Sequence, residues 1–177
     1  MVEPYLHISA LENYDRPEIA AEELPADAYR DDVAANLAVA ERWVTEHPDT
    51  EFDFFLPPYS ILFWDKVIRE GRTEAVFAAI RQAGQTLLQY DNVKFYGYLM
   101  DPEIVTNLDN YCDYIHHSGG VCREILAMLQ REEGRLTEEN LEETLANWRE
   151  FVVHYDYDQF WDERFWIQWN AEHAAAP

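Results

Sequence analysis

"TEFDFFLPP", residues 50–58, is the stretch that decides the predicted fold. Phe52, Phe54 and Leu56 alternate with acidic residues in this short run, which is typical of a strand with one buried face. Two prolines then end the strand, because proline cannot donate to a sheet ladder. A second strand is expected in "NVKFYGYLM" (92–100), which is rich in aromatic residues.

Two helices are expected between these strands. The first covers residues 60–70 and is closed by Gly71, and the second begins at Thr73 as its N-cap. The apolar face of the second helix would consist of Val76, Ile80, Ala83 and Leu87. Strand, helix and strand in this order predict a βαβ unit with parallel strands and a right-handed crossover. Ligands of open α/β sheets bind beyond the carboxyl ends of the strands, which draws attention to the loop at residues 100–117.

Three further helices are expected on either side of this unit. One covers residues 27–46 and is stopped by His47-Pro48, one covers residues 119–131, and one starts at Thr137. Their apolar stripes are Val33, Leu37, Ala40 and Val44; Val121, Ile125 and Leu129; and Leu141, Leu145, Trp148 and Val152. The sequence therefore predicts an irregular lead-in (1–26), an α/β domain with a helix-rich C-terminal part (27–156) and an aromatic, acidic tail (157–177).

The composition excludes several classes of partner. The 177 residues carry a net charge of −22, from 35 acidic and 13 basic residues, so nucleic acid and anionic membrane surfaces are disfavoured. The N-terminus has no signal-peptide pattern, and no apolar run is long enough to span a bilayer. The chain as it stands is expected to stay in the cytoplasm, and no motif implies a cofactor. Cys112 and Cys122 form no paired motif, although a single bridge between them stays possible.

The candidate functional residues lie in "NLDNYCDYIHHSGG", residues 107–120. Asp113 and His116 are three residues apart and can touch in a turn. A carboxylate bonded to one imidazole nitrogen fixes the tautomer and leaves the other nitrogen free to accept a proton. In the plainer interpretation, Asp113 caps a turn, both histidines are ordinary loop residues, and Ser118 caps the next helix.

Three segments in order resemble a bacterial family of SGNH-hydrolase-like (GDSL-like) proteins: "FFLPPYSILFWD" (54–65), "NVKFYGYLMD" (92–101) and "IVTNLDNYCDYIHHS" (104–118). "RLTEENLEETL" (135–145) also looks like the segment that follows in these proteins, so the resemblance covers about residues 30–155. It implies a partial three-layer, flavodoxin-like parallel sheet with flanking helices. It also implies ester hydrolysis or acyl transfer on an ester or acylated carbohydrate, at the cell envelope for a full-length form. His116 would be the general base and Asp113 its orienting carboxylate.

The nucleophile of such a triad is missing from its usual block. In this family a G-D-S-like block follows the first strand, and the chain has none. Its serines are Ser9, Ser60 and Ser118, of which Ser60 at a strand end is the tempting one, although capping of the next helix is its simpler role. Two strands are also few for a parallel sheet. Together these features predict the C-terminal part of a longer protein, inactive alone, whose serine lies on an upstream segment or partner chain.

Two other interpretations stay open at this stage. A metal site could be formed by Cys112, Asp113, His116, His117 and Cys122, although C-x3-H-H-x4-C matches no common zinc pattern. A non-catalytic interaction module is the other, supported by the tryptophans from Trp161 to Trp169, which could serve as interface anchors or as the core face of a docking helix.

Overall fold

The computed structural model describes residues 6–162, and its centre is a three-stranded mixed sheet in the order β1-β2-β3. β1 (Phe52–Phe55) and β2 (Val93–Tyr96) run parallel, with Phe52 beside Val93. The predicted βαβ unit is therefore confirmed. β3 (Arg135–Leu136) lies antiparallel to β2, and this strand was not predicted. A mixed sheet differs from the purely parallel, flavodoxin-like sheet that the family resemblance implies.

The described part of the chain is rich in helices. Seven α-helices and three short 3₁₀ segments are present: α1 (Leu6–Glu12), α2 (Arg30–Glu46), α3 (Ile61–Arg69), α4 (Thr73–Leu87), η1 (Tyr98–Met100), α5 (Pro102–Val105), η2 (Leu108–Asn110), α6 (Gly119–Arg131), α7 (Leu141–His154) and η3 (Tyr157–Trp161). Within residues 6–162, no helix is both long and apolar enough to cross a membrane.

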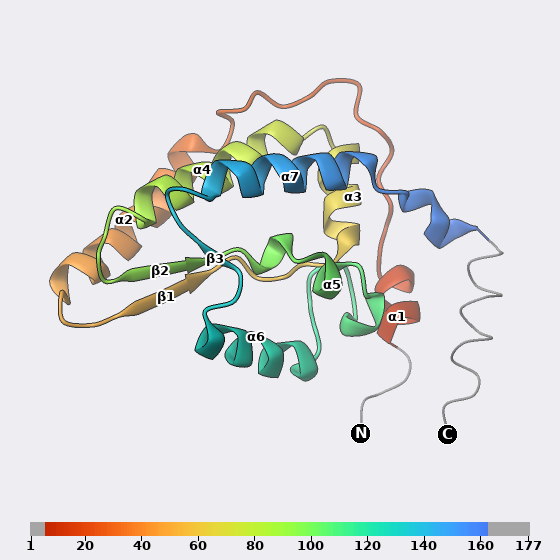
Figure 1. Ribbon diagram of the computed structural model, residues 1–177. Coiled ribbons are helices and arrows are strands. Elements are labelled where there is room, and N and C mark those ends of the chain that lie inside the picture. The colour runs from red at the N-terminus through yellow and green to blue at the C-terminus, as the bar shows by residue number, and fades with distance from the viewer. Residues whose placement is uncertain (1–5, 163–177) are drawn as a thin grey trace.

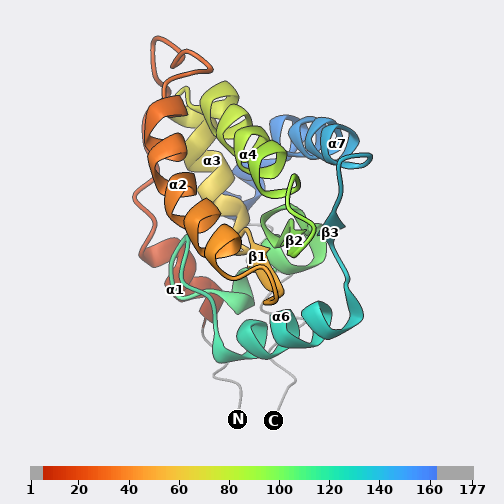
Figure 2. The same ribbon diagram turned by 90° about the vertical axis from the view of Figure 1, so that its left-hand side faces the viewer.

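Helices lie on both faces of the small sheet. α2, α3, α4 and α7 cover one face, and α6 lies against the other, as Figures 1 and 2 show from two directions. The larger core fills the space between the sheet and the first group and includes Trp64, Phe95 and Trp148. A smaller core under α6 is formed by Tyr96, Tyr98, Ile104, Val121, Ile125 and Met128.

Hydrophobic periodicity predicts the long helices well, but it places their starts less well. The stripe of α7 is buried as expected, at Leu141, Leu145, Trp148 and Val152. α4 begins at Thr73 itself, with Arg72 in the N-cap position, so the predicted cap is off by one residue. α7 begins after Asn140 instead of Thr137, because these two residues exchange backbone-to-side-chain hydrogen bonds of 2.8 and 3.3 Å in the preceding turn.

The two ends of the described chain behave differently from the sequence expectation. α1 lies inside the segment expected to be irregular and packs against η2. At the other end, Tyr157 and Phe160 of η3 are buried in the core. Most of the tryptophan-rich tail, which was interpreted as an interface or a docking helix, lies outside the described residues.

Candidate functional site

The structure brings the predicted pair Asp113 and His116 into contact. Oδ2 of Asp113 lies 2.6 Å from Nδ1 of His116. Oδ1 of the same carboxylate accepts hydrogen bonds from the backbone N–H groups of Ile115 and His116, at 2.8 and 2.7 Å. Asp113 therefore caps a turn and also contacts the imidazole ring. The His116 side chain is 70% exposed.

The turn also keeps the Asp113 carboxylate in its charged form. Partial burial acts to raise its pKa, but the N–H groups of His116 and Ile115 and the His116 ring outweigh this effect and lower the pKa below its ordinary value. Asp113 is thus a fixed anion at neutral pH. A catalytic role for Asp113 and His116 stays a prediction, because an oriented exposed histidine is also a common product of turn geometry.

None of the three serines supplies the expected nucleophile. Ser60 is fully buried, and its hydroxyl donates a 2.9 Å hydrogen bond to the carbonyl of Tyr114. Ser60 occupies the N-cap position of α3 without a capping side-chain bond, so its role is to tie the 113–116 turn to the start of that helix. Ser118 accepts a hydrogen bond from Val121 N–H as the N-cap of α6, as predicted. Ser9 lies within α1.

The proposed metal site is also wrong for the described residues. Among residues 6–162, no three His, Cys, Asp or Glu side chains are grouped so as to hold a metal ion. Cys112 and Cys122 are both free and exposed, so no bridge joins them. Cys122 Sγ lies 3.7 Å from the ring nitrogen Nδ1 of His117, and Cys112 Sγ lies 3.4 Å from the backbone carbonyl oxygen of His116.

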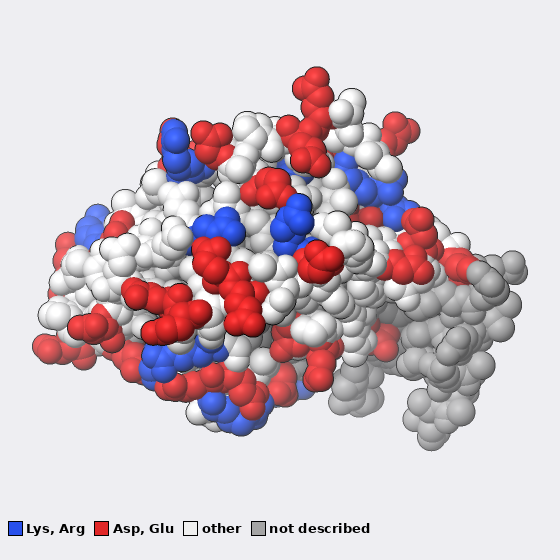
Figure 3. Space-filling view, turned by 45° about the horizontal axis from the view of Figure 1, so that its top comes forward, with Lys and Arg blue, Asp and Glu red and all other residues white. Residues whose placement is uncertain are grey.

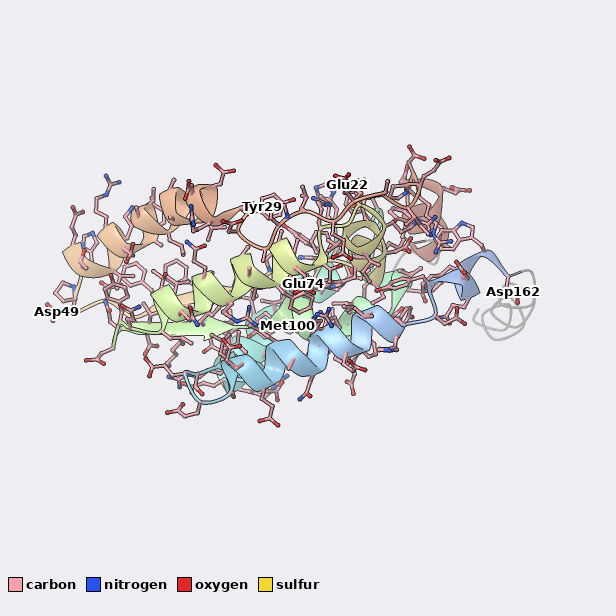
Figure 4. The ribbon with its side chains drawn as sticks, turned by 90° about the horizontal axis from the view of Figure 1, so that it is seen from above. Glu22, Tyr29, Asp49, Glu74, Met100 and Asp162 are labelled. Atoms are coloured by element: carbon pink, nitrogen blue, oxygen red, sulfur yellow. The ribbon has the colours of Figure 1, made fainter. Side chains whose placement is uncertain are left out.

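A cavity of about 350 Å³ lies beyond the carboxyl end of β2, where the fold leads one to look for a ligand. η1, the start of α5, β3 and α7 surround it. Its lining residues are Gly97, Tyr98, Met100, Asp101, Pro102, Glu103, Gly134, Arg135, Leu136 and Thr144. Figure 4 shows Met100 just past the end of β2, in the strip between α4 and α7.

The lining of this cavity is apolar in its depth and charged at its rim. Tyr98, Met100 and Leu136 are buried, whereas Glu103 and Arg135 are exposed. Burial raises the pKa of the Tyr98 hydroxyl well above its ordinary value, so that side chain stays neutral. At the base of the cavity, a hydrogen bond joins two backbone segments: the N–H of Gly97 donates to the carbonyl of Gly134 at 2.9 Å.

Charges of opposite sign reach the rim from different elements. Arg135 belongs to β3 and forms a 2.7 Å ion pair with Glu132 through Nη1. Asp101 is the N-cap of α5, and its Oδ1 accepts hydrogen bonds from Glu103 N–H and Ile104 N–H at 3.0 and 3.3 Å. These two bonds use one carboxylate oxygen only. The lining of the cavity thus includes one arginine, whose guanidinium is paired with Glu132, and two acidic residues.

Sequence reasoning drew attention to the loop at residues 100–117 but did not predict this cavity. Asp101 and Glu103 lie in the loop that was singled out, and Arg135 does not, because β3 is too short to be recognised by periodicity. Gly97 and Gly134 mark the close packing at this cavity, but their role is visible only once the structure is known. A Cβ at Gly97 would lie 2.7 Å from the Met100 side chain, and Gly134 has a φ of +70° with Tyr98 against it.

Comparisons with known proteins give a limited match. No protein-family model matches the chain, and no solved structure does. Over 90 residues, the chain is 24% identical to a "UPF0735 ACT domain-containing protein" of Lacticaseibacillus casei and to one of Lacticaseibacillus paracasei. The match covers 51% of this chain and 62% of each relative, so the chain spans less than two thirds of the curated relatives' length.

These relatives overturn the family resemblance drawn from the sequence. Their names refer to an ACT domain and not to an SGNH hydrolase or acyltransferase. The expected esterase or acyltransferase function, with its missing serine block, is therefore wrong.

Proposed function

We propose that the chain is a non-catalytic ligand-binding domain whose cavity beyond β2 binds a small molecule that carries both an ammonium and a carboxylate group. The observation that carries this proposal is the placement of opposite charges around one cavity of about 350 Å³ at the carboxyl edge of the sheet. That volume falls within the range of small-molecule sites.

The charge pattern determines the class of ligand. Arg135 matches a carboxylate, because its planar guanidinium can donate two parallel hydrogen bonds. Asp101 and Glu103 match an ammonium group, which is a compact donor of three hydrogen bonds. Between these ends, Met100 and Leu136 offer an apolar surface for a short side chain. A free amino acid combines all three features.

The comparisons support the same kind of role. The relatives are named for an ACT domain, which is a regulatory ligand-binding type of domain. Such a domain needs no nucleophile, so the buried Ser60 and the exposed His116 raise no difficulty for this proposal. The upstream segment or partner chain expected from the small size of the sheet stays a prediction.

Titration calorimetry with a panel of free L-amino acids tests the proposal. At least one of them should bind measurably, and its amide and its deaminated analogue should bind at least about ten-fold more weakly. The reason is that each charge-assisted hydrogen bond contributes about 1.5–3 kcal/mol, and about 1.4 kcal/mol corresponds to a factor of ten.

Two variants locate the binding at the cavity. Arg135→Gln should weaken binding by about ten-fold or more, whereas Arg131→Gln, which removes an exposed arginine of α6 outside the cavity, should leave it unchanged. Glu103→Gln should weaken binding without affecting folding, because this side chain is exposed. The proposal fails if no amino acid binds, or if the two arginine variants behave alike.

A further inference from the structure

β1 is an edge strand of the sheet, and the outward half of its backbone is unpaired. The N–H groups of Phe52 and Leu56 donate hydrogen bonds of 2.9 Å to carbonyl groups of the segment that contains β2. The groups that pair with one neighbour alternate along a strand, so the N–H and C=O groups of Asp53 and Phe55 point away from β2. Within residues 6–162, these four groups form no hydrogen bond. Residues 52–55 are therefore an open edge, to which a further strand can be added.

The two faces of this open edge differ in chemistry. Phe52 and Phe54 are half-buried and pack against the larger core. Because side chains alternate along a strand, Asp53 and Phe55 point to the opposite face, on the side of α6. The Phe55 ring lies 5.9 Å from the ring of Tyr98 in the smaller core, yet Phe55 is 41% exposed. The edge thus has partly uncovered apolar surface on both of its faces.

The open edge carries little protection against pairing with another strand. β1 has no lysine and no proline, and its register with β2 runs without a bulge. Asp53 is exposed and forms no ion pair within residues 6–162, whereas Glu51, just before the strand, pairs with Lys94 at 3.0 Å. Burial raises the pKa of Tyr96, and the charge of Asp53 adds to this effect. An unpaired carboxylate therefore lies in the middle of the unpaired backbone.

The charges of the open edge select the kind of strand that fits it. Glu51 and Asp53 are two residues apart and so point to the same face. A second copy of this chain would bring the same acidic pair to the interface, together with the same net charge of −22. Like charges on neighbouring strands are destabilising, whereas opposite charges stabilise the pairing. A strand with lysine or arginine on this face fits the edge better than a second copy does.

We propose that the open edge of β1 binds an extended segment of a partner protein in which basic and apolar residues alternate. The backbone of the segment pairs with Asp53 and Phe55 and adds a fourth strand to the sheet. Its basic side chains face Glu51 and Asp53, and its apolar side chains cover Phe52 and Phe54. No residue of β1 lines the cavity beyond β2, so this proposal does not depend on the ligand of that cavity.

A synthetic hexapeptide of alternating lysine and valine, with blocked ends, is the probe for this proposal. Amide hydrogen exchange of the full chain, followed by NMR, should show that the N–H groups of Asp53 and Phe55 exchange freely without the peptide. At saturating peptide they should exchange at least about ten-fold more slowly, because they then donate to the added strand. The same hexapeptide with every backbone nitrogen methylated should give no protection, because it has no N–H groups to donate to the edge.

The role of charge is tested with one variant and its matched control. Asp53→Asn should weaken binding of the lysine–valine peptide by about two- to five-fold, the range expected for one exposed ion pair. Asp49→Asn removes an exposed carboxylate from the turn before β1 and should leave binding unchanged. A hexapeptide of alternating glutamate and valine should bind the unchanged protein more weakly than the lysine–valine peptide does.

Four results would overturn the proposal. Protection of Asp53 and Phe55 without peptide, together with a dimer in sedimentation, would show that a second copy occupies the edge. Failure of the lysine–valine peptide to protect these two N–H groups would rule out strand addition. Equal binding of the methylated peptide would show only general attraction to an acidic surface. Equal effects of Asp53→Asn and Asp49→Asn would exclude Asp53 as the group that recognises the basic residues.

Discussion

At the scale of single residues, Asp65 shows how one buried charge is held in this molecule. Its carboxylate is almost fully buried in α3 and accepts hydrogen bonds from Tyr14 Oη at 3.0 Å and from Arg16 Nε and Nη2 at 2.8 and 3.2 Å. Burial, followed by the Asp65 charge, raises the pKa of Tyr14 well above its ordinary value. Arg16 also pairs with Asp158 at 2.7 Å and lies 4.1 Å from the Trp161 ring centroid. This arginine therefore joins the two ends of the described chain to α3.

Replacing Arg16 by methionine should destabilise the protein by about 3 kcal/mol, because Asp65 would be left as a buried charge without its counter-ion. The thermal midpoint should fall by roughly 6–12 °C for a chain of this size. The matched control is Arg30→Met. Arg30 pairs with Asp27 and Asp31 at the exposed start of α2, where an ion pair contributes about 1 kcal/mol or less.

A double variant distinguishes charge burial from lost packing. Asp65→Leu together with Arg16→Met removes both charges, so it should recover part of the stability that Arg16→Met loses. Thermal denaturation followed by circular dichroism measures all three variants. Equal losses in Arg16→Met and Arg30→Met would show that the Asp65 charge is not effectively buried.

The candidate sites also show what single residues reveal in a sequence. The contact between Asp113 and His116 could be predicted because residues three apart meet in any turn, whatever the rest of the fold. The cavity could not, because Arg135 lies more than thirty positions from Asp101 and reaches it only through the pairing of β3 with β2. The function of neither site follows from residue types alone.

At the scale of elements, the sequence predicts the helices whose apolar residues recur periodically. It misses the short strand that forms only by pairing with another strand. α2, α6 and α7 were foreseen because their apolar residues recur every three or four positions over several turns. β3 has two residues and therefore no period, and its existence depends on β2 beside it. The start of α7 is displaced from Thr137 because this residue and Asn140 exchange hydrogen bonds in the preceding turn, which periodicity does not record.

The junction between α3 and α4 depends on Gly71. Its φ is +65°, and a Cβ there would lie 2.6 Å from the backbone carbonyl oxygen of Glu22. The N–H of Leu24 donates a 2.7 Å hydrogen bond to the Gly71 carbonyl, and Ala20 N–H donates one of the same length to Arg69. The segment before α2 is thereby fastened across the end of α3, and only glycine leaves room for it.

Gly71→Ala should therefore destabilise the protein by about 2 kcal/mol or more, since it adds backbone strain to a contact that only a backbone shift can relieve. Gly119→Ala is the matched control. It lies at the start of α6, and the nearest atom to its new Cβ would be an Arg123 side-chain nitrogen at 3.9 Å. The control should be neutral or stabilising by about 0.5–1 kcal/mol, because alanine restricts the unfolded chain. Urea denaturation measures both, and similar effects would contradict the tight approach.

At the scale of the whole molecule, the main feature is the excess of acidic over basic side chains. On the face drawn in Figure 3, acidic side chains outnumber basic ones, and several basic groups lie directly beside acidic ones. Lys94 is an example, because it bridges Glu51 and Glu132 at 3.0 and 2.7 Å across the sheet edge. Such pairs engage basic side chains, which are few. The net charge of −22 therefore leaves carboxylates that repel one another.

Salt should therefore stabilise this protein at neutral pH. Raising sodium chloride from about 0.01 M to about 1 M shortens the Debye length from about 30 Å to about 3 Å. This screens the long-range repulsion more than it weakens exposed ion pairs, each of which contributes about 1 kcal/mol or less. The thermal midpoint should rise by several degrees over this range. Near the isoelectric point of about 4.4, the same series should give a much smaller rise, because little net charge is left to screen. A midpoint that falls with salt at neutral pH would show that the ion pairs around Lys94, Arg131 and Arg149 outweigh the repulsion.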